Sequence, residues 1–422
     1  MKQQQFKKTI LASLLTLGTG VAVSAPYDIV DLGGLDGNYN VAYKINEHGV
    51  AVGMANGPIN EEEEQREFFA HAVKYQSGAN EDLGVLTDGE ASEALGINAA
   101  GVAVGYSNVL TEVEQENGDT VIQEEIFAVI FDGNIEALPE KDNLIETRAF
   151  DINDSNFIVG HGRFDEDPDD ANSAVDRGFI YNNNDQTYFM VPTLADEVTR
   201  QSYMTSISNA GKAIGFSDAK VADSEQYTIK SFIVDTNNQN AITELPTKDD
   251  RATFAHGINI HDEVVGSVYI SGSRNNQEAF YYDAQSGSEE LTFLGFLGSS
   301  YTDSRARAIN DNGQIVGRAL VSTPTLNEFA AFIYENNEMK NLNNLISCDS
   351  GWKLTEATDI NNAGQVIGFG VKDGEVRAFR LDPTGGEVEV CETEEDNNSG
   401  GGSVPVMMLV LLSLFGLRRK QS

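Results

Sequence analysis

A short pattern of apolar, polar and glycine positions recurs seven times along this chain. Each copy begins with Ile followed by Asn or Ser, as in Ile309-Asn310, and reaches Gly, Asn or Asp three residues after that polar residue. Three residues further on, an apolar residue precedes glycine, as in Val316-Gly317. A strand-like unit with a period near 50 residues is typical of a β-propeller. The copies lie 51 to 55 residues apart and start at Ile45, Ile97, Ile152, Ile207, Ile258, Ile309 and Ile360.

The repeated pattern predicts a β-hairpin. Gly, Asn and Asp tolerate a positive φ angle, so the position of Gly313 is expected to be a left-handed turn position. The Asn or Ser that follows the Ile is expected to cap the same turn with its side chain, and apolar strands flank the turn on both sides. The second glycine, such as Gly317, would let a neighbouring backbone or ring approach closely.

The rest of each repeat predicts two more strands. A small residue and an apolar residue, such as Ala331-Phe332, mark a third strand, and a polar turn then leads to a fourth. The longest connection follows the fourth strand, so it must cross from the rim of one blade to the centre of the next. This places the Ile-Asn strand innermost. The sequence therefore predicts an all-β fold over residues 26–383, a single β-propeller with seven four-stranded blades.

The two ends of the repeat region predict how the ring closes. The chain starts with a fourth-type strand at Tyr27–Gly33, and the last repeat ends with a third-type strand at Arg377–Leu381. The N-terminal strand is therefore expected to complete the last blade and to hide the free edges of both strands.

Residues 1–25 have the pattern of a secretory signal peptide. Lys2, Lys7 and Lys8 precede an apolar stretch that runs from Ile10 to Val23, and small residues follow it. An N-terminal membrane anchor is the alternative, but the apolar stretch is short for a membrane span. The chain is therefore expected to be exported, with signal peptidase as a partner.

Residues 384–403 form an acidic and then glycine-rich linker, and residues 404–422 form a separate tail. The tail contains an apolar segment, Val404–Leu417, followed by Arg418-Arg419-Lys420. At about 1.5 Å per residue this segment gives about 21 Å of helix, against a hydrocarbon core of about 30 Å. We therefore expect 404–417 to contact the inner membrane transiently and to be removed, with a permanent anchor as the alternative.

Charge changes the picture on the surface. The formal net charge of −38 repels phosphates and anionic lipid, so no nucleic-acid partner is expected. Acidic residues concentrate in the links between the second and third strands of the first three repeats. Clustered carboxylates can bind divalent cations such as Ca²⁺, and a solvated surface is the alternative. The candidate cation ligands are Glu61, Glu62, Glu63, Glu64, Asp165, Asp167, Asp169 and Asp170.

The two cysteines, Cys348 and Cys391, flank the last repeat. Because an exported chain meets oxidising conditions, we expect them to form a disulfide rather than to remain free thiols. The bond would hold the C-terminal strand at the seam of the ring.

No residue pattern predicts a catalytic site. The five histidines lack a metal-binding spacing, and Ser217-Asp218-Ala219-Lys220 matches a Ser-x-x-Lys motif at a position that other repeats fill with unrelated residues. The leading hypothesis is a non-enzymatic propeller that binds a partner, a glycan or cations. The alternative is a hydrolase or lyase acting on extracellular polysaccharide, with its carboxylates around the propeller centre.

The repeats also resemble a known family. Seven Ile-Asn-x-x-Gly-x-x-Val-Gly copies with small-Phe strands resemble HAF-type extracellular repeats. With Ser350-Gly351-Trp352 before the last copy, the arrangement is similar to that of DUF3466-type proteins of Gram-negative bacteria. The resemblance covers Tyr27–Leu381 and implies a fold but no reaction. Departures are Ser208 in place of Asn, and Asn156 and Asp262 in place of the turn glycine.

The C-terminal tail resembles a GlyGly-CTERM sorting signal in its glycines, its apolar segment and its basic end. In that family a rhomboid-type protease (rhombosortase) cuts near the glycines, and type II secretion carries the substrate to the cell surface. The resemblance thus implies a cell-surface or extracellular protein that meets these two machineries and an unknown extracellular ligand. The implied cleavage region is Gly400, Gly401, Gly402 and Ser403.

Overall fold

The structure is a computed structural model of the 422-residue chain. It describes residues 24–388 except for 36, 58–69, 77–79, 116–117, 166–173, 196, 198, 272, 274, 299–301 and 324–325. The apolar part of the predicted signal peptide, the sorting tail, Cys391, Glu61–Glu64 and the aspartates of 166–173 lie outside the described residues.

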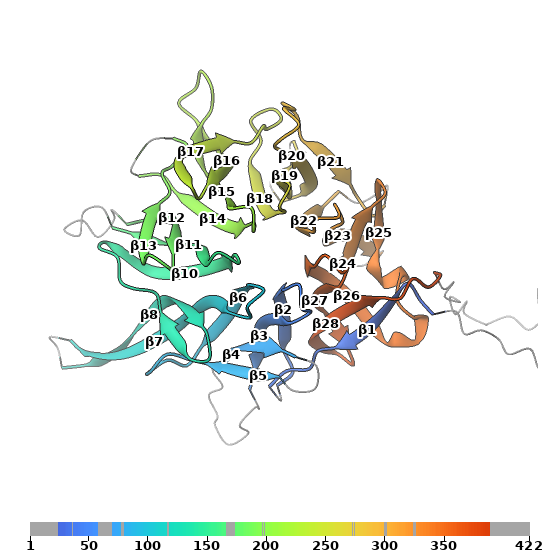
Figure 1. The fold of residues 1–422 in the computed structure, drawn as a ribbon, viewed down its shortest axis with the longest axis horizontal. Helices are drawn as coiled ribbons and strands as arrows, with labels where there is room; N and C mark the ends of the chain where they lie inside the picture. The colour runs from blue at the N-terminus through green and yellow to red at the C-terminus, as the bar shows by residue number, and fades with distance from the viewer. Residues whose placement is uncertain are drawn as a thin grey trace, which may run out of the picture. The chain divides into compact units, whose positions relative to one another are not determined.

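The described residues form seven four-stranded antiparallel sheets arranged as the blades of a ring, which confirms the predicted propeller (Figure 1). Blade 1 contains β2 (Asn40–Ile45), β3 (Ala51–Asn56), β4 (Ala70–Tyr75) and β5 (Glu81–Gly84). Blade 2 contains β6 (Ser92–Ile97), β7 (Ala103–Glu114), β8 (Thr120–Phe131) and β9 (Ile135–Ala137). Blade 3 contains β10 (Leu144–Ile152), β11 (Phe157–Phe164), β12 (Val175–Asn182) and β13 (Thr187–Met190).

The next three blades repeat this order. Blade 4 contains β14 (Ser202–Ile207), β15 (Lys212–Lys220), β16 (Tyr227–Asp235) and β17 (Asn238–Glu244). Blade 5 contains β18 (Thr253–Ile258), β19 (Glu263–Tyr269), β20 (Gln277–Asp283) and β21 (Thr292–Gly295). Blade 6 contains β22 (Ser304–Ile309), β23 (Ile315–Thr323), β24 (Leu326–Glu335) and β25 (Glu338–Asn341).

Blade 7 joins the two ends of the chain. It contains β26 (Trp352–Ile360), β27 (Val366–Lys372) and β28 (Glu375–Pro383), and its fourth strand is β1 (Tyr27–Asp31). β1 pairs antiparallel with β28 in a register that sets Ile29 opposite Leu381. The predicted closure by the N-terminal strand is thus confirmed.

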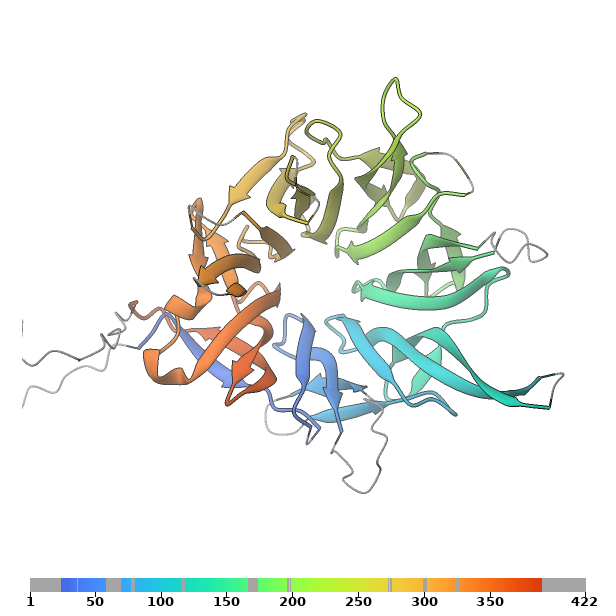
Figure 2. The same cartoon turned by 180° about the vertical axis from the view of Figure 1, so that it is seen from behind.

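The Ile-Asn strands are innermost, as predicted, and the fourth strands lie at the rim; both views along the ring show this order (Figures 1 and 2). Two short 3-10 helices, η1 (Leu342–Asn344) and η2 (Cys348–Ser350), precede β26. Among the described residues, no helix has the length and apolar character to cross a membrane. The disulfide between Cys348 and Cys391 stays a prediction.

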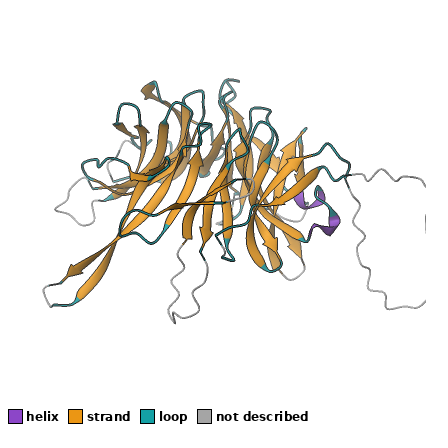
Figure 3. Cartoon of the chain, turned by 60° about the horizontal axis from the view of Figure 1, so that its bottom comes forward, coloured by secondary structure: helices purple, strands orange, loops and turns teal. Residues whose placement is uncertain are grey.

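Antiparallel order gives the propeller two different faces. The tight turns between strands one and two and between strands three and four lie on one face, here called the turn face. The links between strands two and three, and the crossovers to the next blade, lie on the other, here called the crossover face. In blade 2 the acidic insertion lengthens β7 and β8 to 12 residues each, and this hairpin projects from the body (Figure 3).

The turn chemistry predicted from the sequence is present in every blade. The fifth residue of each copy has φ between 60° and 85°, whether it is glycine, Asn156 or Asp262. In blade 6 the Asn310 side-chain oxygen accepts hydrogen bonds from the backbone N–H groups of Asn312 and Gln314, at 3.1 and 3.0 Å. The polar residue therefore caps its own turn.

The glycine after the turn is required by a β-bulge in the innermost strand. Each innermost strand has a register shift two residues before the repeated Ile, between Ala42 and Lys44 in blade 1 and between Ala306 and Ala308 in blade 6. At this bulge the backbone of the innermost strand comes very close to the second strand. A Cβ atom added to Gly317 would lie 2.0 Å from the carbonyl oxygen of Arg305, and the other six glycines give distances of 1.8 to 2.1 Å. Side chains do not fit at such distances, so glycine keeps the inner two strands together.

The core lies between blades rather than at a common centre. Phe232 of blade 4, for example, is fully buried in one cluster with Val159 and Ile180 of blade 3. The corresponding aromatic residue of each of the last five blades is also completely buried. Burying each of these rings contributes about 2–3 kcal/mol. The fully buried rings are Phe179, Phe232, Phe280, Phe332 and Phe379.

Candidate functional site

At the turn face, the residues that follow the repeated Ile form a ring of hydrogen bonds between blades. We call Asn46, Asn98, Asn153, Ser208, Asn259, Asn310 and Asn361 the asparagine ring. Five of its side-chain amides donate to the backbone oxygen of the equivalent residue in the next blade, at 3.0 to 3.1 Å. The bond from Asn361 to Asn46 joins the last blade to the first.

The residues that follow the asparagine ring form a second set of contacts between blades. Asp154 accepts a hydrogen bond from the backbone of Ala99 in the preceding blade at 2.8 Å. Asp311 does the same for Ile260, and Asn362 for Asp311. These polar side chains at the turn face therefore form hydrogen bonds that hold neighbouring blades together.

A cavity of about 160 Å³ lies on the propeller axis, beside the asparagine ring. Lys44, Asp151 and Asp359 contribute to its lining. The Lys44 ammonium lies 3.2 Å from the Asp151 carboxylate, which also accepts a hydrogen bond from the Ser206 hydroxyl at 2.7 Å. The Asp359 carboxylate accepts from the backbone N–H of Ile45 at 2.9 Å. These contacts link blade 1 to blades 3 and 7.

The two aspartates of this cavity are almost fully buried. Burial raises the pKa of Asp359 to about 6, although the Lys44 charge works against that increase. Burial also opposes the charged form of Lys44, but the carboxylates of Asp151 and Asp359 raise its pKa above the usual value. Lys44 therefore acts as an internal counter-ion, which makes this cavity a structural feature of the ring.

Toward the crossover face, the same inner strands carry different side chains in each blade. Immediately beyond the bulge glycine, one residue of the innermost strand lies opposite one residue of the second strand. We call these seven cross-strand pairs the variable belt. The pairs are Val41/Met54, Glu93/Tyr106, Arg148/His161, Tyr203/Phe216, Phe254/Ser267, Arg305/Arg318 and Glu356/Phe369.

Blades 1 to 3 bring a glutamate, tyrosines and an arginine together at the belt. Glu93 shares hydrogen bonds with Tyr43 and Tyr106, and the Arg148 guanidinium lies 5.2 Å from the centre of the Tyr106 ring. Burial raises the pKa of Glu93, while the two tyrosines and Arg148 stabilise its charged form. This carboxylate is therefore held by its neighbours.

Blades 3 to 5 contribute a continuous line of rings, which we call the aromatic row. Successive ring centroids are 4.9 to 5.6 Å apart, a spacing typical of stacked and edge-to-face pairs. All six rings are partly exposed, unlike the buried phenylalanines between the blades. The row consists of Phe150, His161, Tyr203, Phe216, Phe254 and Tyr269.

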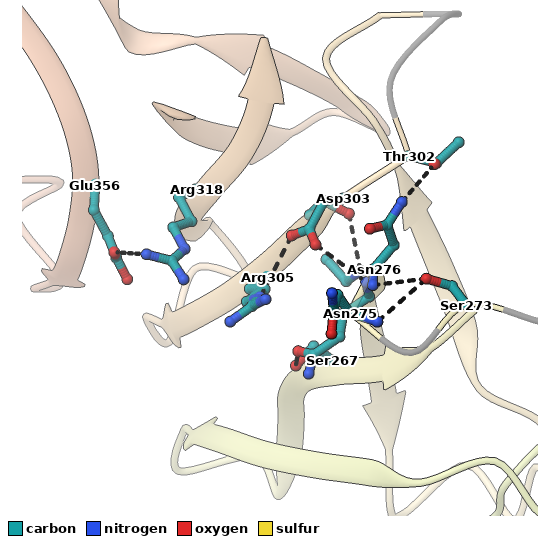
Figure 4. Close-up of polar contacts among 12 residues, drawn as sticks. Ser267, Ser273, Asn275, Asn276, Thr302, Asp303, Arg305, Arg318 and Glu356 are labelled. Carbon is teal, nitrogen blue, oxygen red and sulfur yellow. Dashed lines mark hydrogen bonds and ion pairs between the residues drawn. The ribbon is translucent and has the colours of Figure 1, made fainter. Parts of the chain in front are cut away.

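Blades 6 and 7 contribute a charged group, which we call the cationic corner: Arg305, Arg307, Arg318, Asp303 and Glu356. Figure 4 labels all of these residues except Arg307. Both oxygens of the Glu356 carboxylate are engaged, one by Arg307 at 2.5 Å and one by Arg318 at 2.8 Å. The Arg305 guanidinium lies 3.4 Å from the Asp303 carboxylate. Three guanidinium groups thus face two carboxylates, an excess of one positive charge.

This corner leaves buried hydrogen-bonding capacity unused. Within the described residues, the Nε atoms of Arg305 and Arg318 and one Asp303 oxygen are buried without a hydrogen-bond partner. The Arg305–Asp303 contact is close enough for an ion pair but lacks hydrogen-bond geometry. Neighbouring His256 stays uncharged, because burial and then the three arginines lower its pKa well below the usual value.

The two carboxylates of the belt, and that of Asp176 on β12, have structural partners. Glu356 is paired with two arginines, Glu93 is bonded to tyrosines, and Asp176 accepts from the Tyr203 hydroxyl at 2.5 Å. A glycosidase needs two carboxylates that are positioned for acid and base roles on one bond. Each of these three carboxylates is therefore engaged by other side chains.

Of the cation ligands that the sequence nominated, only one is among the described residues, and it is not part of the belt. Asp165 follows β11 on the crossover face, while Glu61–Glu64, Asp167, Asp169 and Asp170 lie outside the described residues. In the part of the chain that is described, no group of three or more His, Cys, Asp and Glu side chains is placed to hold a metal ion. The proposed cation site therefore stays a prediction.

Sequence reasoning missed the variable belt, although the repeats contain a signal for it. The first member of each pair always precedes the repeated Ile by four residues, and the second always follows the bulge glycine. These two positions change chemistry from blade to blade, while the Ile-Asn and glycine positions beside them barely change. Aligning the seven copies by position would have identified the belt.

The fold and its side chains define a seven-bladed β-propeller. Its turn face is held together by hydrogen bonds between blades, and the variable belt, toward the crossover face, carries different side chains in each blade. The family model described as "Protein of unknown function (DUF3466)" matches residues 87–247 and 206–373. The chain therefore belongs to the DUF3466 family. No curated protein sequence matches the chain.

Several solved propellers have a similar structure at low sequence identity. The β-propeller domain of the Trilobed protease from Pyrococcus furiosus is 10% identical with a TM-score of 0.46, covering 82% of this chain and 94% of that one. Pyrococcus horikoshii acylaminoacyl peptidase is 9% identical with a TM-score of 0.48, covering 83% of this chain and 52% of that one. An oligogalacturonate lyase in complex with manganese is 9% identical with a TM-score of 0.46, covering 86% and 97%. We infer no activity from these likenesses.

Proposed function

We propose that this protein is an exported, non-enzymatic propeller that binds an extracellular glycan at the variable belt. The observation that carries the proposal is the aromatic row. Six rings lie in contact along the inner strands of three blades, and each remains partly exposed. A propeller core does not need such a row, because the buried phenylalanines already fill the spaces between blades.

The aromatic row has the properties of a sugar-binding surface. The faces of aromatic rings bind apolar C–H surfaces, and the Tyr hydroxyl offers a polar contact at the edge of the ring. Ligand sites combine such rings with a few convergent polar groups. Here those groups are Arg148 and Glu93 at one end of the row and the cationic corner at the other.

A location outside the cell is consistent with a glycan ligand. The pattern of residues 1–25 and the glycine-rich sorting tail support export and display at the cell surface, with signal peptidase, a rhomboid-type protease and type II secretion as partners. The same location would favour the proposed bond between Cys348 and Cys391.

A binding titration tests this function. Neutral and acidic oligosaccharides would be titrated into the secreted protein by calorimetry, and into the variants Tyr203→Ala and Phe216→Ala. Tyr282→Ala on β20 is the matched control, because Tyr282 is also partly exposed but lies on the third strand. We expect the two belt variants to weaken binding about five- to tenfold, as loss of a stacked ring costs about 1 to 1.5 kcal/mol.

Three results would overturn the proposal. One is that no oligosaccharide binds, and another is that Tyr282→Ala weakens binding as much as the belt variants do. The third is turnover: new reducing ends or an ultraviolet-absorbing unsaturated product, abolished by belt substitutions, would establish the hydrolase or lyase alternative.

A further inference from the structure

We propose that the cationic corner is an oxyanion subsite and that the ligand of the belt is an acidic glycan, whose carboxylate or sulfate group binds between Arg305 and Arg318. The inference rests on the proposed glycan-binding function and names the chemical class of its ligand.

The register of blade 6 brings the two arginines together. Arg305 on β22 and Arg318 on β23 are directly opposite each other, so both side chains leave the same side of the sheet. They take the place that Tyr203 and Phe216 occupy in blade 4. The third guanidinium, that of Arg307, follows two residues later on β22.

Glu356 positions two of these arginines without neutralising the corner. Its two oxygens bind Arg307 and Arg318, and its side chain is 6% exposed, whereas the three arginine side chains are 22% to 29% exposed. The arginine side chains are therefore partly exposed to solvent, while the Glu356 carboxylate stays buried. The corner keeps an unbalanced positive charge inside a chain whose net charge is −38.

The unused donors specify what kind of group would bind. An oxyanion with two or three oxygens accepts two parallel N–H groups from one guanidinium, a geometry that favours carboxylate, sulfate and phosphate. The Nε–H of Arg318 is buried without a hydrogen-bond partner among the described residues, and the Nε–H of Arg305 faces the Asp303 carboxylate at 3.4 Å without hydrogen-bond geometry. A bound oxyanion would accept hydrogen bonds from the exposed part of these guanidinium groups and would offset the desolvation of the donors.

The surroundings of the corner indicate an oxyanion that is carried by a sugar. The aromatic row ends on Phe254 and Tyr269 in blade 5, and both strands that carry these rings pack against β22. A sugar ring stacked on the end of the row would therefore direct a substituent toward Arg305. The strongly negative net charge of the chain would repel an acidic polymer, so the corner provides the local attraction that such a ligand needs.

The test uses the secreted protein and a matched set of oligosaccharides: a mannuronic acid tetramer, its methyl ester, and a sulfated neutral tetramer. The methyl ester keeps the sugar and removes the charge. We expect the acid to bind about 10- to 100-fold more tightly than its ester, since charge-assisted hydrogen bonds supply that difference. We also expect its affinity to fall as salt concentration rises.

The variant Arg305→Gln/Arg318→Gln should reduce the affinity for the acid to that of the ester and leave the affinity for the ester unchanged. Arg318→Lys keeps the charge and should lose only part of the effect, because an ammonium cannot bind an oxyanion through two parallel bonds. Arg163→Gln is the control, since Arg163 forms an exposed ion pair with Glu146 on blade 3. Thermal melting of every variant reports whether the fold is intact.

The outcomes separate the two proposals. Equal binding of acid and ester, lost in Tyr203→Ala, would contradict the oxyanion subsite and leave glycan binding in place. An acid preference that survives Arg305→Gln/Arg318→Gln in a folded variant would also contradict the subsite. Absence of binding to every oligosaccharide would overturn both proposals. Preference for the sulfated tetramer over the uronate would assign the oxyanion to a sulfate ester.

Discussion

The two ends of the innermost strands perform different tasks, although they belong to the same seven repeats. At the turn face the asparagine ring is buried, and its side chains bind neighbouring blades. At the crossover half, 11 of the 14 residues of the variable belt are partly exposed, and their chemistry changes from blade to blade. A repeat protein can thus keep one end of each unit for assembly and release the other end for recognition.

The largest expected effect concerns closure of the ring, on which both the turn face and the variable belt depend. Deleting residues 26–33 removes β1, which contains buried Tyr27 and pairs with β28 along its whole length. We expect a loss of about 5 kcal/mol or more in the free energy of unfolding, together with aggregation through the exposed edge. Urea unfolding and light scattering measure both effects. A truncated protein that melts as cooperatively and as high as the parent would show that closure is not needed.

The next effect concerns the bulge glycine of each blade, which lies between the asparagine ring and the variable belt. In Gly266→Ala the new Cβ would lie 2.0 Å from the Phe254 carbonyl oxygen and 2.9 Å from the Phe280 ring. We expect a loss of about 3 kcal/mol, because backbone and a buried ring must both move. Gly57→Ala is the control, since a Cβ there meets no atom within 4 Å. Equal unfolding midpoints in urea for the two variants would be incompatible with the close approach described here.

A smaller effect tests the structural role of the turn face. Asn310→Ala removes the amide that donates to the Asn361 carbonyl at 3.0 Å, so that this carbonyl keeps only its bond from the Gly364 N–H. It also removes the oxygen that accepts from the backbone N–H groups of Asn312 and Gln314. We expect a loss of about 2–3 kcal/mol in stability and no change in the affinity for an oligosaccharide. Asn134→Ala, at an exposed turn position, is the control. Weaker ligand binding by Asn310→Ala, at a temperature where the variant is fully folded, would contradict the claim that the turn face has only a structural role.

The smallest effect is a pH dependence that arises in the belt. Burial lowers the pKa of His161 from 6.5 to about 4, so folding favours its neutral form. The stability that depends on neutral His161 is complete above pH 6.5 and is lost as the pH falls toward 4. At pH 5 the loss is at most about 2 kcal/mol. Chemical unfolding at pH 7 and pH 5 should show a smaller pH effect in His161→Phe than in the parent, and identical pH effects would refute this role.

The sequence predicted the fold in detail and the site hardly at all. The Ile-Asn and glycine positions were recognisable because every blade needs the same turn, the same bulge and the same close approach, so they recur. Closure by Tyr27–Asp31 followed from the count of strand types at the two ends. The belt was not recognised, because no motif spans residues that come from different blades. Arg307 and Glu356, for example, are 49 positions apart and form their ion pair only when the ring is assembled.

The acidic links between strands two and three were nominated as a cation site because their charge is concentrated locally in the sequence. A run such as Glu61–Glu64 is conspicuous in the sequence, whereas three arginines distributed over a strand pair are not. Local density of charge is visible in a sequence, but the balance of charge at a folded site depends on which residues the strand register sets side by side. Arg305 and Arg318 are a clear case, since the bulge and the hairpin together place them opposite each other.

Hydrogen exchange of the secreted protein with and without a saturating mannuronic acid tetramer tests the central claim most directly. The account predicts slower exchange in the crossover halves of β14, β15, β18, β19, β22 and β23, and unchanged exchange at the turns that follow Ile207, Ile258 and Ile309. Protection confined to those turns, or spread equally over all seven blades, would contradict the claim that one end assembles the ring and the other recognises the ligand.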